Sequence, residues 1–337
     1  MVTVSGGELA VVGLGIVAPG VLGPGGALAA AGEPVSGWFR AEVALPGRGY
    51  RRLPDACKYL LAASRLAVGD AGDRLARTEP NHRAAVVGIN HTGAALLEEL
   101  DHTIIREGAD AMSPSASPFI AMSSFASRLS MEHGITGFNL TVNSPVTAGL
   151  EALQIAARAV AAGRARTVLV GAVEEALSPS QTLPPARPTA PRSEAGAVVL
   201  HCEPVVGDNA RYGTCGARGA FLAHHAAAGA AAAVLASLLG DDPPDRIDAV
   251  LDDSAVGTAV ARWLGRLCDE VVLVPAPAQA GCLLPLQRVL GLFAQEHAVP
   301  TRRAVLAASA QGSIALADMT VAPRHTAPSE GGGALVV

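Results

Sequence analysis

Asn139-Leu-Thr-Val-Asn-Ser-Pro-Val-Thr-Ala-Gly-Leu-Glu-Ala-Leu153, together with the segment that ends Thr167-Val-Leu-Val-Gly-Ala172, decides the fold. Leu140 to Val142 is short, apolar and β-branched, as is typical of a strand. From Thr147 apolar residues recur at helical spacing until Gly163. Residues 167–170 are apolar on both faces, which is typical of a central parallel strand. The stretch therefore predicts a buried strand, a tight elbow at residues 144–146, a helix and a second buried strand.

The elbow places one residue over the start of a helix. Backbone N–H groups and the helix macrodipole favour negative charge there. A cysteine at that point would have a lowered pKa and would be an effective nucleophile. The residue is Val146, whose side chain neither attacks nor donates nor accepts. The elbow therefore has the form needed for covalent catalysis but lacks the reacting atom.

Strands alternate with helices along the rest of the chain, which predicts a layered α/β fold with covered sheets. The 337 residues are enough for one domain or two closely packed ones. Residues 178–193 are rich in Pro and Ser and are predicted to form a loop. Strands are predicted at residues 9–17, 83–89, 195–201, 219–222, 247–251, 271–274 and 304–308, and helices at 55–72, 93–107, 225–239, 257–268 and 281–297, with another helix ending near 133–134.

Composition excludes several classes of function. Half of the residues are hydrophobic but 3% are aromatic, so Ala, Val and Leu must fill the core. The net charge of −5 and the absence of a basic run argue against a nucleic-acid partner. The five cysteines lack CxxC spacing, which predicts reduced thiols in the cytoplasm and no metal site. The start of the chain has no signal-peptide pattern, and no apolar run is long enough for a membrane.

A glycine pattern near the start formally matches a dinucleotide-binding fingerprint. Gly13-Leu-Gly15-Ile-Val-Ala18 has the spacing, but Pro19-Gly20 follows where a helix should begin. No second strand ending in an acidic residue follows at the required distance. We therefore expect no nucleotide and no other cofactor.

The central stretch resembles the β-ketoacyl synthase family of the thiolase fold. The resemblance rests on residues 139–142, 147–153 and 168–175, and residues 10–20 are similar to the family's opening strand. It implies a layered αβαβα thiolase-like fold with two pseudo-repeated halves, residues 1–201 and 202–337. In the family the nucleophilic cysteine stands three residues before the glycine that matches Gly149, and this is the place of Val146.

The remaining catalytic positions of the family also lack their usual residues. The run that contains one histidine matches Ser254-Ala-Val-Gly-Thr258, and the second histidine, after a helix-start glycine, matches Cys282. Pro277 stands near the position of the family's lysine. The turn at residues 309–314 has neither the Phe nor the Asn of the family. Because the members of such a relay depend on one another, we expect no condensation activity.

An inactive relative of this kind resembles the chain-length factors of type II polyketide synthases. The resemblance implies a heterodimer with a catalytic ketosynthase and, mainly through that partner, contact with an acyl carrier protein that holds the polyketide chain. It also implies a role in shaping the acyl tunnel. Val146, where aromatic systems usually have Gln, and the short length look more like the inactive subunits of polyene-forming systems. The implied tunnel or interface residues, each of which could instead be ordinary core, are Thr92, Phe119, Ile120, Ala121, Met122 and Phe125.

Two alternatives remain open at this point. The chain could be a thiolase-fold acyltransferase or hydrolase that uses a helix-start thiol at Cys282 or the pair Asp252-Asp253. The more ordinary interpretation is a small filler at Cys282 and a solvated acidic pair. A homodimeric scaffold or carrier-docking subunit is the other alternative. Glu174 and Glu175, at a strand end, are predicted to be solvated or interface charges.

Overall fold

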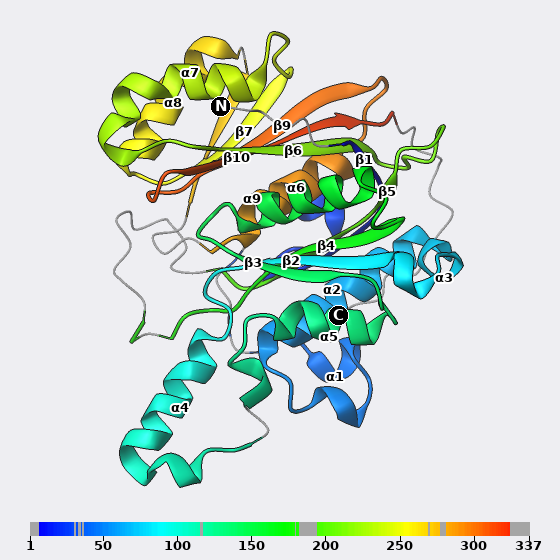
Figure 1. Ribbon diagram of the computed structural model, residues 1–337, viewed down its shortest axis with the longest axis vertical. Helices are drawn as coiled ribbons and strands as arrows, with labels where there is room; N and C mark the ends of the chain where they lie inside the picture. Colours follow the sequence, from blue (N-terminus) through cyan, green and yellow to red (C-terminus); the bar gives the residue numbers. More distant parts are fainter. Residues whose placement is uncertain are drawn as a thin grey trace.

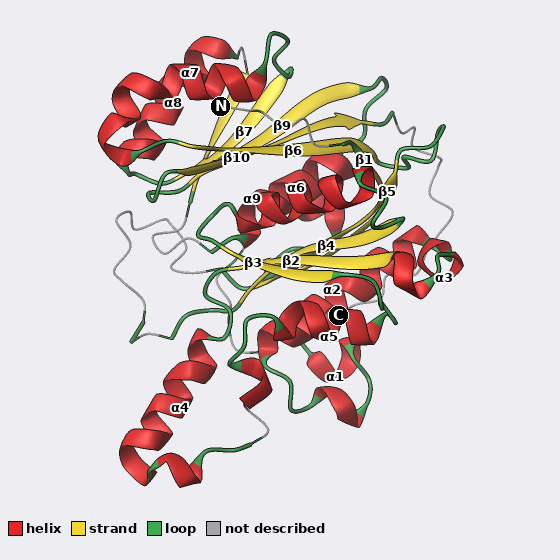
Figure 2. Cartoon of the chain, in the orientation of Figure 1, coloured by secondary structure: helices red, strands yellow, loops and turns green. Residues whose placement is uncertain are grey.

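The computed structural model describes residues 7–29, 32, 35, 37–114, 117–178, 180–181, 194–268, 270–276 and 281–323. Within these ranges ten strands form one continuous hydrogen-bonded sheet in the order β3-β2-β4-β5-β1-β6-β10-β9-β7-β8 (Figure 2). The first half holds β1 (Leu9–Val17), β2 (Arg83–Ile89), β3 (Asn139–Asn143), β4 (Thr167–Glu174) and β5 (Gly196–Pro204). The second half holds β6 (Gly213–Phe221), β7 (Arg246–Leu251), β8 (Glu270–Pro275), β9 (Thr301–Ala308) and β10 (Ser313–Val321).

The two halves repeat one topology. Read from its outer edge, the first half runs β3-β2-β4-β5-β1 and the second runs β8-β7-β9-β10-β6. In both halves the three outer strands are parallel and the other two pairings are antiparallel. The expectation of two pseudo-repeated halves is therefore confirmed. The exact division between residues 201 and 202 stays a prediction, and β5 continues past it to Pro204.

Helices and sheet halves alternate as layers (Figure 1). The central helices α6 (Ala148–Ala161) and α9 (Leu283–Ala294) lie between the two halves of the sheet and touch strands of both. Helices α2 (Asp55–Ala71) and α5 (Ser124–Glu132) cover the outer face of the first half. Helices α7 (Ala227–Leu239) and α8 (Ala255–Leu267) cover the second. The layered αβαβα expectation is confirmed.

The remaining helical segments are short, with one exception. Helix α4 (Ala94–Glu107) stands away from the layered body (Figure 1). The others lie in connections: α1 (Ala41–Ala44), α3 (Arg74–Arg77) and the 3-10 turns η1 (Pro24–Gly26), η2 (Arg48–Tyr50), η3 (Pro80–His82), η4 (Ala109–Ala111), η5 (Ser117–Phe119) and η6 (His224–Ala226).

Small residues allow the layers to approach closely. A Cβ added to Gly15 would strike the backbone oxygen of Ala63 in α2. A Cβ on Gly88 would lie 2.6 Å from the backbone carbon of Ala148, at the start of α6. Gly13 and Gly15 therefore lie inside β1 and make room for α2. Close packing of helix on strand explains the glycine pattern that resembled a dinucleotide fingerprint.

The structure corrects some of the expected elements. β3 is an edge strand paired only with β2 among the described residues, and Leu140 is 42% exposed, so the expectation of a buried strand is wrong for this chain alone. β6 begins at Gly213, earlier than residue 219. β10 was not expected. Its register with β6 and β9 comes from pairing across the sheet, which sequence pattern does not contain.

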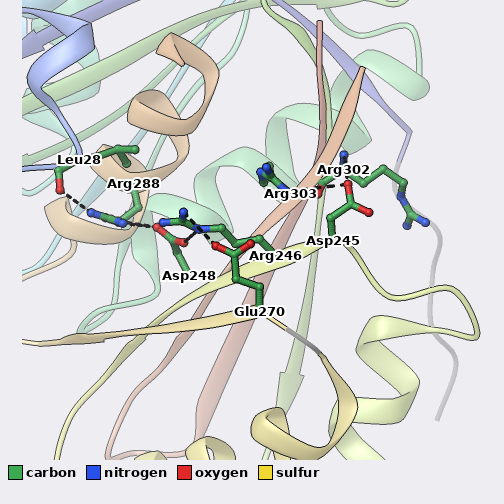
Figure 3. Close-up of polar contacts among 8 residues, drawn as sticks. All are labelled: Leu28, Asp245, Arg246, Asp248, Glu270, Arg288, Arg302 and Arg303. Carbon is green, nitrogen blue, oxygen red and sulfur yellow. Dashed lines mark hydrogen bonds and ion pairs between the residues drawn. The ribbon is translucent and has the colours of Figure 1, made fainter. Parts of the chain in front are cut away.

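A buried ion pair joins the central layer to the second half of the sheet (Figure 3). On α9 the Arg288 guanidinium meets the carboxylate of Asp248, on β7, with Nε and Nη2 both donating to Oδ2. Nη1 of the same guanidinium donates to the Leu28 carbonyl at 2.7 Å. Arg246 Nε donates to the other oxygen of Asp248 at 2.8 Å. The fully buried Asp248 carboxylate is thus bonded from two sides.

Removing the Asp248 carboxylate should destabilise the fold strongly. Asp248→Ala leaves the buried Arg288 charge unpaired, and we expect a loss of about 3–5 kcal/mol in the free energy of unfolding, measured by urea denaturation. Asp242→Ala is the control, because Asp242 pairs with Arg302 at the surface. It should cost less than about 1 kcal/mol. Equal losses in the two variants would contradict the structural role of the buried pair.

Candidate functional site

The elbow between β3 and α6 has a strained backbone. Val146 is buried and has φ of 62°, and it is the only non-glycine residue in the described ranges with positive φ. A β-branched residue in this region of backbone space costs roughly 1–3 kcal/mol. Such strain persists only where the surrounding structure imposes it. The predicted tight elbow is present, and it holds a side chain that disfavours its conformation.

Polar side chains next to Val146 hold the elbow in place. Ser144 and Thr147 bond each other through their hydroxyls at 2.9 Å. The two hydroxyl oxygens also lie 3.1 and 2.7 Å from the carboxylate of Glu151, one turn into α6, so the hydroxyl that does not donate to the other can donate to this carboxylate. The Ser144 N–H donates to the Ile89 carbonyl at the end of β2. The network fixes the start of α6 against the sheet.

The start of α9 lies directly against the elbow. The Val146 N–H donates to the Gly281 carbonyl at 3.1 Å. A Cβ on Gly149 would lie 3.0 Å from the Cys282 carbonyl oxygen and 3.1 Å from Leu286 Cβ. The elbow N–H, which in a covalent acyl enzyme could stabilise an oxyanion, is therefore already bonded inside the protein.

The predicted catalytic positions are only partly brought together. At the elbow Val146 bonds Gly281, the residue before Cys282, as described. Ser254 instead caps α8, because its hydroxyl accepts the Gly257 N–H at 3.0 Å. Pro277 lies outside the described residues. The chemical inactivity of this set stays a prediction.

Cys282 does not have the properties of an activated thiol. It is fully buried, and burial raises its pKa well above the ordinary value, with the nearby Glu174 and Glu194 carboxylates acting in the same direction. The supposition of a helix-start thiol with a lowered pKa is therefore wrong. The macrodipole at the start of α9 is met by carboxylates, which leaves no electropositive environment for a thiolate.

The acidic pair Asp252-Asp253 serves the turn after β7. Asp252 Oδ1 accepts the Ser254 N–H at 3.1 Å, and Asp253 is exposed. A Cβ on Gly257 would strike the Asp252 backbone oxygen, so the turn is tight. Asp252 therefore stabilises the turn that leads into α8.

Glu174 and Glu175 are buried, so the expectation of solvated charges is wrong. Glu174 accepts the Cys282 N–H and the His91 N–H, each at 2.9 Å. Glu175 accepts the Gly93 N–H at 2.9 Å and the Ala95 N–H at 3.2 Å. Both carboxylates thus satisfy the free N–H groups at helix starts. Burial raises the pKa of Glu174 to about 7 and also raises that of Glu175.

Glu194 is a half-buried acid at the same place, and the sequence pattern does not predict its role. Its carboxylate accepts the N–H groups of Leu283 and Leu284 at 3.1 and 3.0 Å. Desolvation, with a smaller effect of the neighbouring Glu174 charge, raises its pKa to about 8. An acid at the end of a Pro- and Ser-rich segment gives no sign in the sequence that it will reach a helix start far along the chain.

The six predicted tunnel or interface residues fall into three environments. Ile120, Ala121 and Met122 are exposed, at 45% for Ile120 and 54% for Met122. Phe125 is in the core beneath the first half of the sheet, and Phe119 packs against the same cluster. Thr92 is buried and donates to the Val173 carbonyl at 2.7 Å. Whether they line a tunnel stays a prediction.

A groove of about 580 Å³ lies between α4 and the start of α2. Of the six predicted residues it includes Phe119, and Glu175 lies on its wall. Leu96, Leu100 and Met112 supply apolar surface, while Arg52, Asp55 and Glu99 supply charge. The groove is therefore of mixed polarity in the isolated chain.

Two histidines, His133 and His201, lie within hydrogen-bonding distance of hydroxyl groups. His201 Nε2 lies 2.6 Å from the Thr167 hydroxyl, and His133 Nε2 lies 2.8 Å from the Ser64 hydroxyl. Burial lowers the pKa of each to about 4. The described residues contain no group of three side chains suited to a metal ion. Every helix in those ranges is too short or too polar to cross a lipid bilayer.

Comparison with known proteins agrees with this geometry. Residues 40–186, which contain the elbow, match the family "Beta-ketoacyl synthase, N-terminal domain". This part of the chain is therefore similar to the β-ketoacyl synthase family. It is 34% identical over 136 residues to the putative polyketide beta-ketoacyl synthase 1 of Streptomyces halstedii, covering 38% of this chain and 32% of that protein. It is 25% identical over 144 residues to the chloroplastic 3-oxoacyl-[acyl-carrier-protein] synthase I of Arabidopsis thaliana, covering 42% and 30%. The matches thus span about a third of the length of these relatives.

Solved structures extend the likeness to nearly the whole chain. "The ishigamide ketosynthase/chain length factor" has a TM-score of 0.73 at 18% identity, covering 94% of this chain and 100% of that one. A chain from "AntDE:AntF (apo): type II PKS acyl-carrier protein in complex with its ketosynthase bound to the hexaketide" has a TM-score of 0.74 at 15% identity, covering 94% and 99%. The chain has their thiolase-like ketosynthase fold, as expected.

The carboxyl groups of Glu174 and Glu194 predict a fall in stability above pH 6.5. Glu174 and Glu194 titrate near 7 and 8 in the folded protein but near 4.5 when unfolded. Between pH 6.5 and 8 the folded protein therefore holds more protons, and the free energy of unfolding falls as the pH rises. His133 and His201, with lowered pKa values, act in the opposite direction but below pH 6.5. Urea denaturation at pH 6.5 and pH 8 measures the fall.

The variant Glu194→Gln should reduce this fall, because its amide does not titrate. Glu107→Gln is the control, since Glu107 is exposed at the end of α4. An unchanged pH dependence in Glu194→Gln would contradict the assignment.

Cys282 should not form an acyl adduct. Intact-mass analysis after incubation with an acyl thioester should show no added acyl group on the native protein, because the thiol is buried and protonated. An adduct that disappears in Cys282→Ala would overturn this expectation and favour the acyltransferase alternative.

Proposed function

We propose that this chain is a non-catalytic, chain-length-factor-like subunit that pairs with an active ketosynthase and shapes the acyl tunnel of a type II polyketide synthase. The observation that carries the proposal is the elbow. Its backbone conformation is kept at Val146 although the residue is strained there and has no nucleophilic atom. A scaffold needed for its shape accounts for both features.

The surroundings of the elbow support loss of catalysis. The Val146 N–H is bonded to Gly281, the thiol of Cys282 is buried with a raised pKa, and Ser254 is used as a helix cap. None of these three groups offers a general base or a free oxyanion donor. A cysteine at position 146 would restore the nucleophilic sulfur, but the other catalytic groups of the family would still be absent.

An exposed apolar surface beside the edge strand supports pairing with another subunit. β3 has one unpaired edge among the described residues and carries the half-exposed Leu140. Ile120 and Met122 are also exposed, and Met122 Sδ accepts a hydrogen bond from Asn143 Nδ2 at 3.3 Å, which places it beside β3. An unpaired strand edge next to apolar side chains suits pairing with a second subunit of the same fold.

The similarity in fold supports a choice of partner subunit. Solved structures of similar fold carry the names ketosynthase and chain length factor. We propose a catalytic ketosynthase as the partner, with the acyl carrier protein meeting the complex mainly through it. A tunnel needs apolar walls and a stopper, because each buried methylene gains roughly 0.8 kcal/mol until the wall is reached. Thr92, Phe119, Ile120 and Ala121 are the proposed wall residues.

The subtype is part of the proposal. Val146 stands where aromatic systems usually carry Gln. This substitution favours a polyene-forming system. Product analysis of the reconstituted complex tests this directly, because reduced, conjugated products are expected and cyclised aromatic ones would contradict the subtype.

Co-expression with a ketosynthase from a gene adjacent to the gene of this chain tests the function. A soluble heterodimer should form, and the variants Ile120→Trp and Ala121→Trp should yield products shorter by one or more two-carbon units, as measured by mass spectrometry. Val206→Trp is the control, because Val206 is exposed on the loop after β5. Absence of a heterodimer would refute the pairing, and unchanged product lengths in both variants would refute the tunnel role.

A further inference from the structure

Helix α4 is held in place by very little apolar packing. Of its 14 residues only Leu100 is buried. Leu97, Ile104 and Ile105 are exposed, Ile105 at 79%. Figure 1 shows the helix projecting from the layered body. Since helices in proteins owe most of their stability to packing of an apolar face, α4 needs another source of order.

The first turn of α4 has no capping side chain of its own. The N-cap position is Gly93, with φ of 92° and no side chain to accept a hydrogen bond. The free N–H groups of Gly93 and Ala95 both donate to Oε1 of Glu175. A carboxylate at this point also interacts favourably with the helix macrodipole. Glu175, from the segment that follows β4, thus replaces the missing cap.

Glu174 holds the residues that lead into α4. Its Oε2 accepts the His91 N–H at 2.9 Å and lies 3.4 Å from the Thr92 hydroxyl. Thr92 is fixed further by its bond to the Val173 carbonyl. The other oxygen of Glu174 accepts the Cys282 N–H at the start of α9. One carboxylate therefore connects the base of α4 to the helix that contacts the elbow.

Neither carboxylate forms an ion pair with another described residue. The polar contacts that the structure gives them are backbone N–H groups, among them that of Ala56 in the first turn of α2, together with the Thr92 hydroxyl and the Cys282 thiol. Burying two adjacent carboxyl groups is costly unless their hydrogen bonds compensate. The starts of α4 and α9, with the first turn of α2, supply this compensation, and the burial in turn fixes the positions of these helix starts.

We infer that Glu174 and Glu175 are positioning residues that fix the base of α4, and with it Thr92 and the exposed apolar face of the helix, for contact with the partner subunit. The link to the partner rests on the proposed function. The hydrogen bonds of Glu174 and Glu175 to the base of α4, which we call the clamp, are a property of the isolated chain. They can be tested without a partner.

Hydrogen exchange of the purified chain tests the clamp. In Glu175→Ala the amides of residues 93–107 should exchange about 10-fold faster than in the wild type, because two charge-assisted hydrogen bonds are lost. Glu175→Gln keeps a neutral acceptor and should show a smaller increase. The amides of α6 should exchange at the wild-type rate in both variants, which shows that the fold is intact.

Glu107→Ala, at the exposed far end of α4, is the matched control and should leave residues 93–97 unchanged. Wild-type exchange of α4 in Glu175→Ala would overturn the inference. If that variant does not fold, wild-type exchange of α4 in Glu175→Gln overturns it.

Co-expression separates this inference from the proposed function. With the ketosynthase, Glu175→Ala should weaken the heterodimer about 10-fold or broaden the range of product lengths. Faster α4 exchange with unchanged assembly and products would overturn the link to the partner while leaving the clamp. Failure of the wild-type chain to form any heterodimer would refute the proposed function alone.

Discussion

The close approach of the two central helices is the constraint on which the rest of the structure depends. α6 and α9 lie between the two halves of the sheet, and each must contact strands on both sides. Only small residues permit this, such as Gly88 under the start of α6 and Gly149 against Cys282. Small residues at these contacts are therefore a requirement of the architecture.

This packing brings the ends of several elements to one place and leaves their backbone groups to be satisfied without water. The start of α9 is met by Glu174 and Glu194, and the start of α4 by Glu175. The elbow N–H is met by Gly281. In a catalytic relative such donors could face a substrate. Here the protein's own carbonyl and carboxyl groups occupy them, so the site is satisfied internally.

Sequence reasoning succeeded where a local pattern carries the information. The elbow at Val146 and the alternation of strands and helices follow from short-range periodicity and are present. It failed where long-range pairing decides. β10 is defined by its neighbours β6 and β9, and Leu140 is exposed because no second strand covers β3 in the described chain. The sequence predicts solvated or interface charges at Glu174 and Glu175, because no neighbouring residue indicates that distant helix starts will cover them.

The amino-acid sequence alone determined the layered fold class and the absence of a cysteine at the elbow. Both follow from patterns of residues that lie close together along the chain. The tertiary structure alone decided that Cys282 is buried with a raised pKa, that Ser254 caps a helix, and that three glutamates bind helix starts. The physical reason is that desolvation and hydrogen bonding depend on which groups meet in space. These groups are separated by up to 108 residues, as Glu174 and Cys282 are.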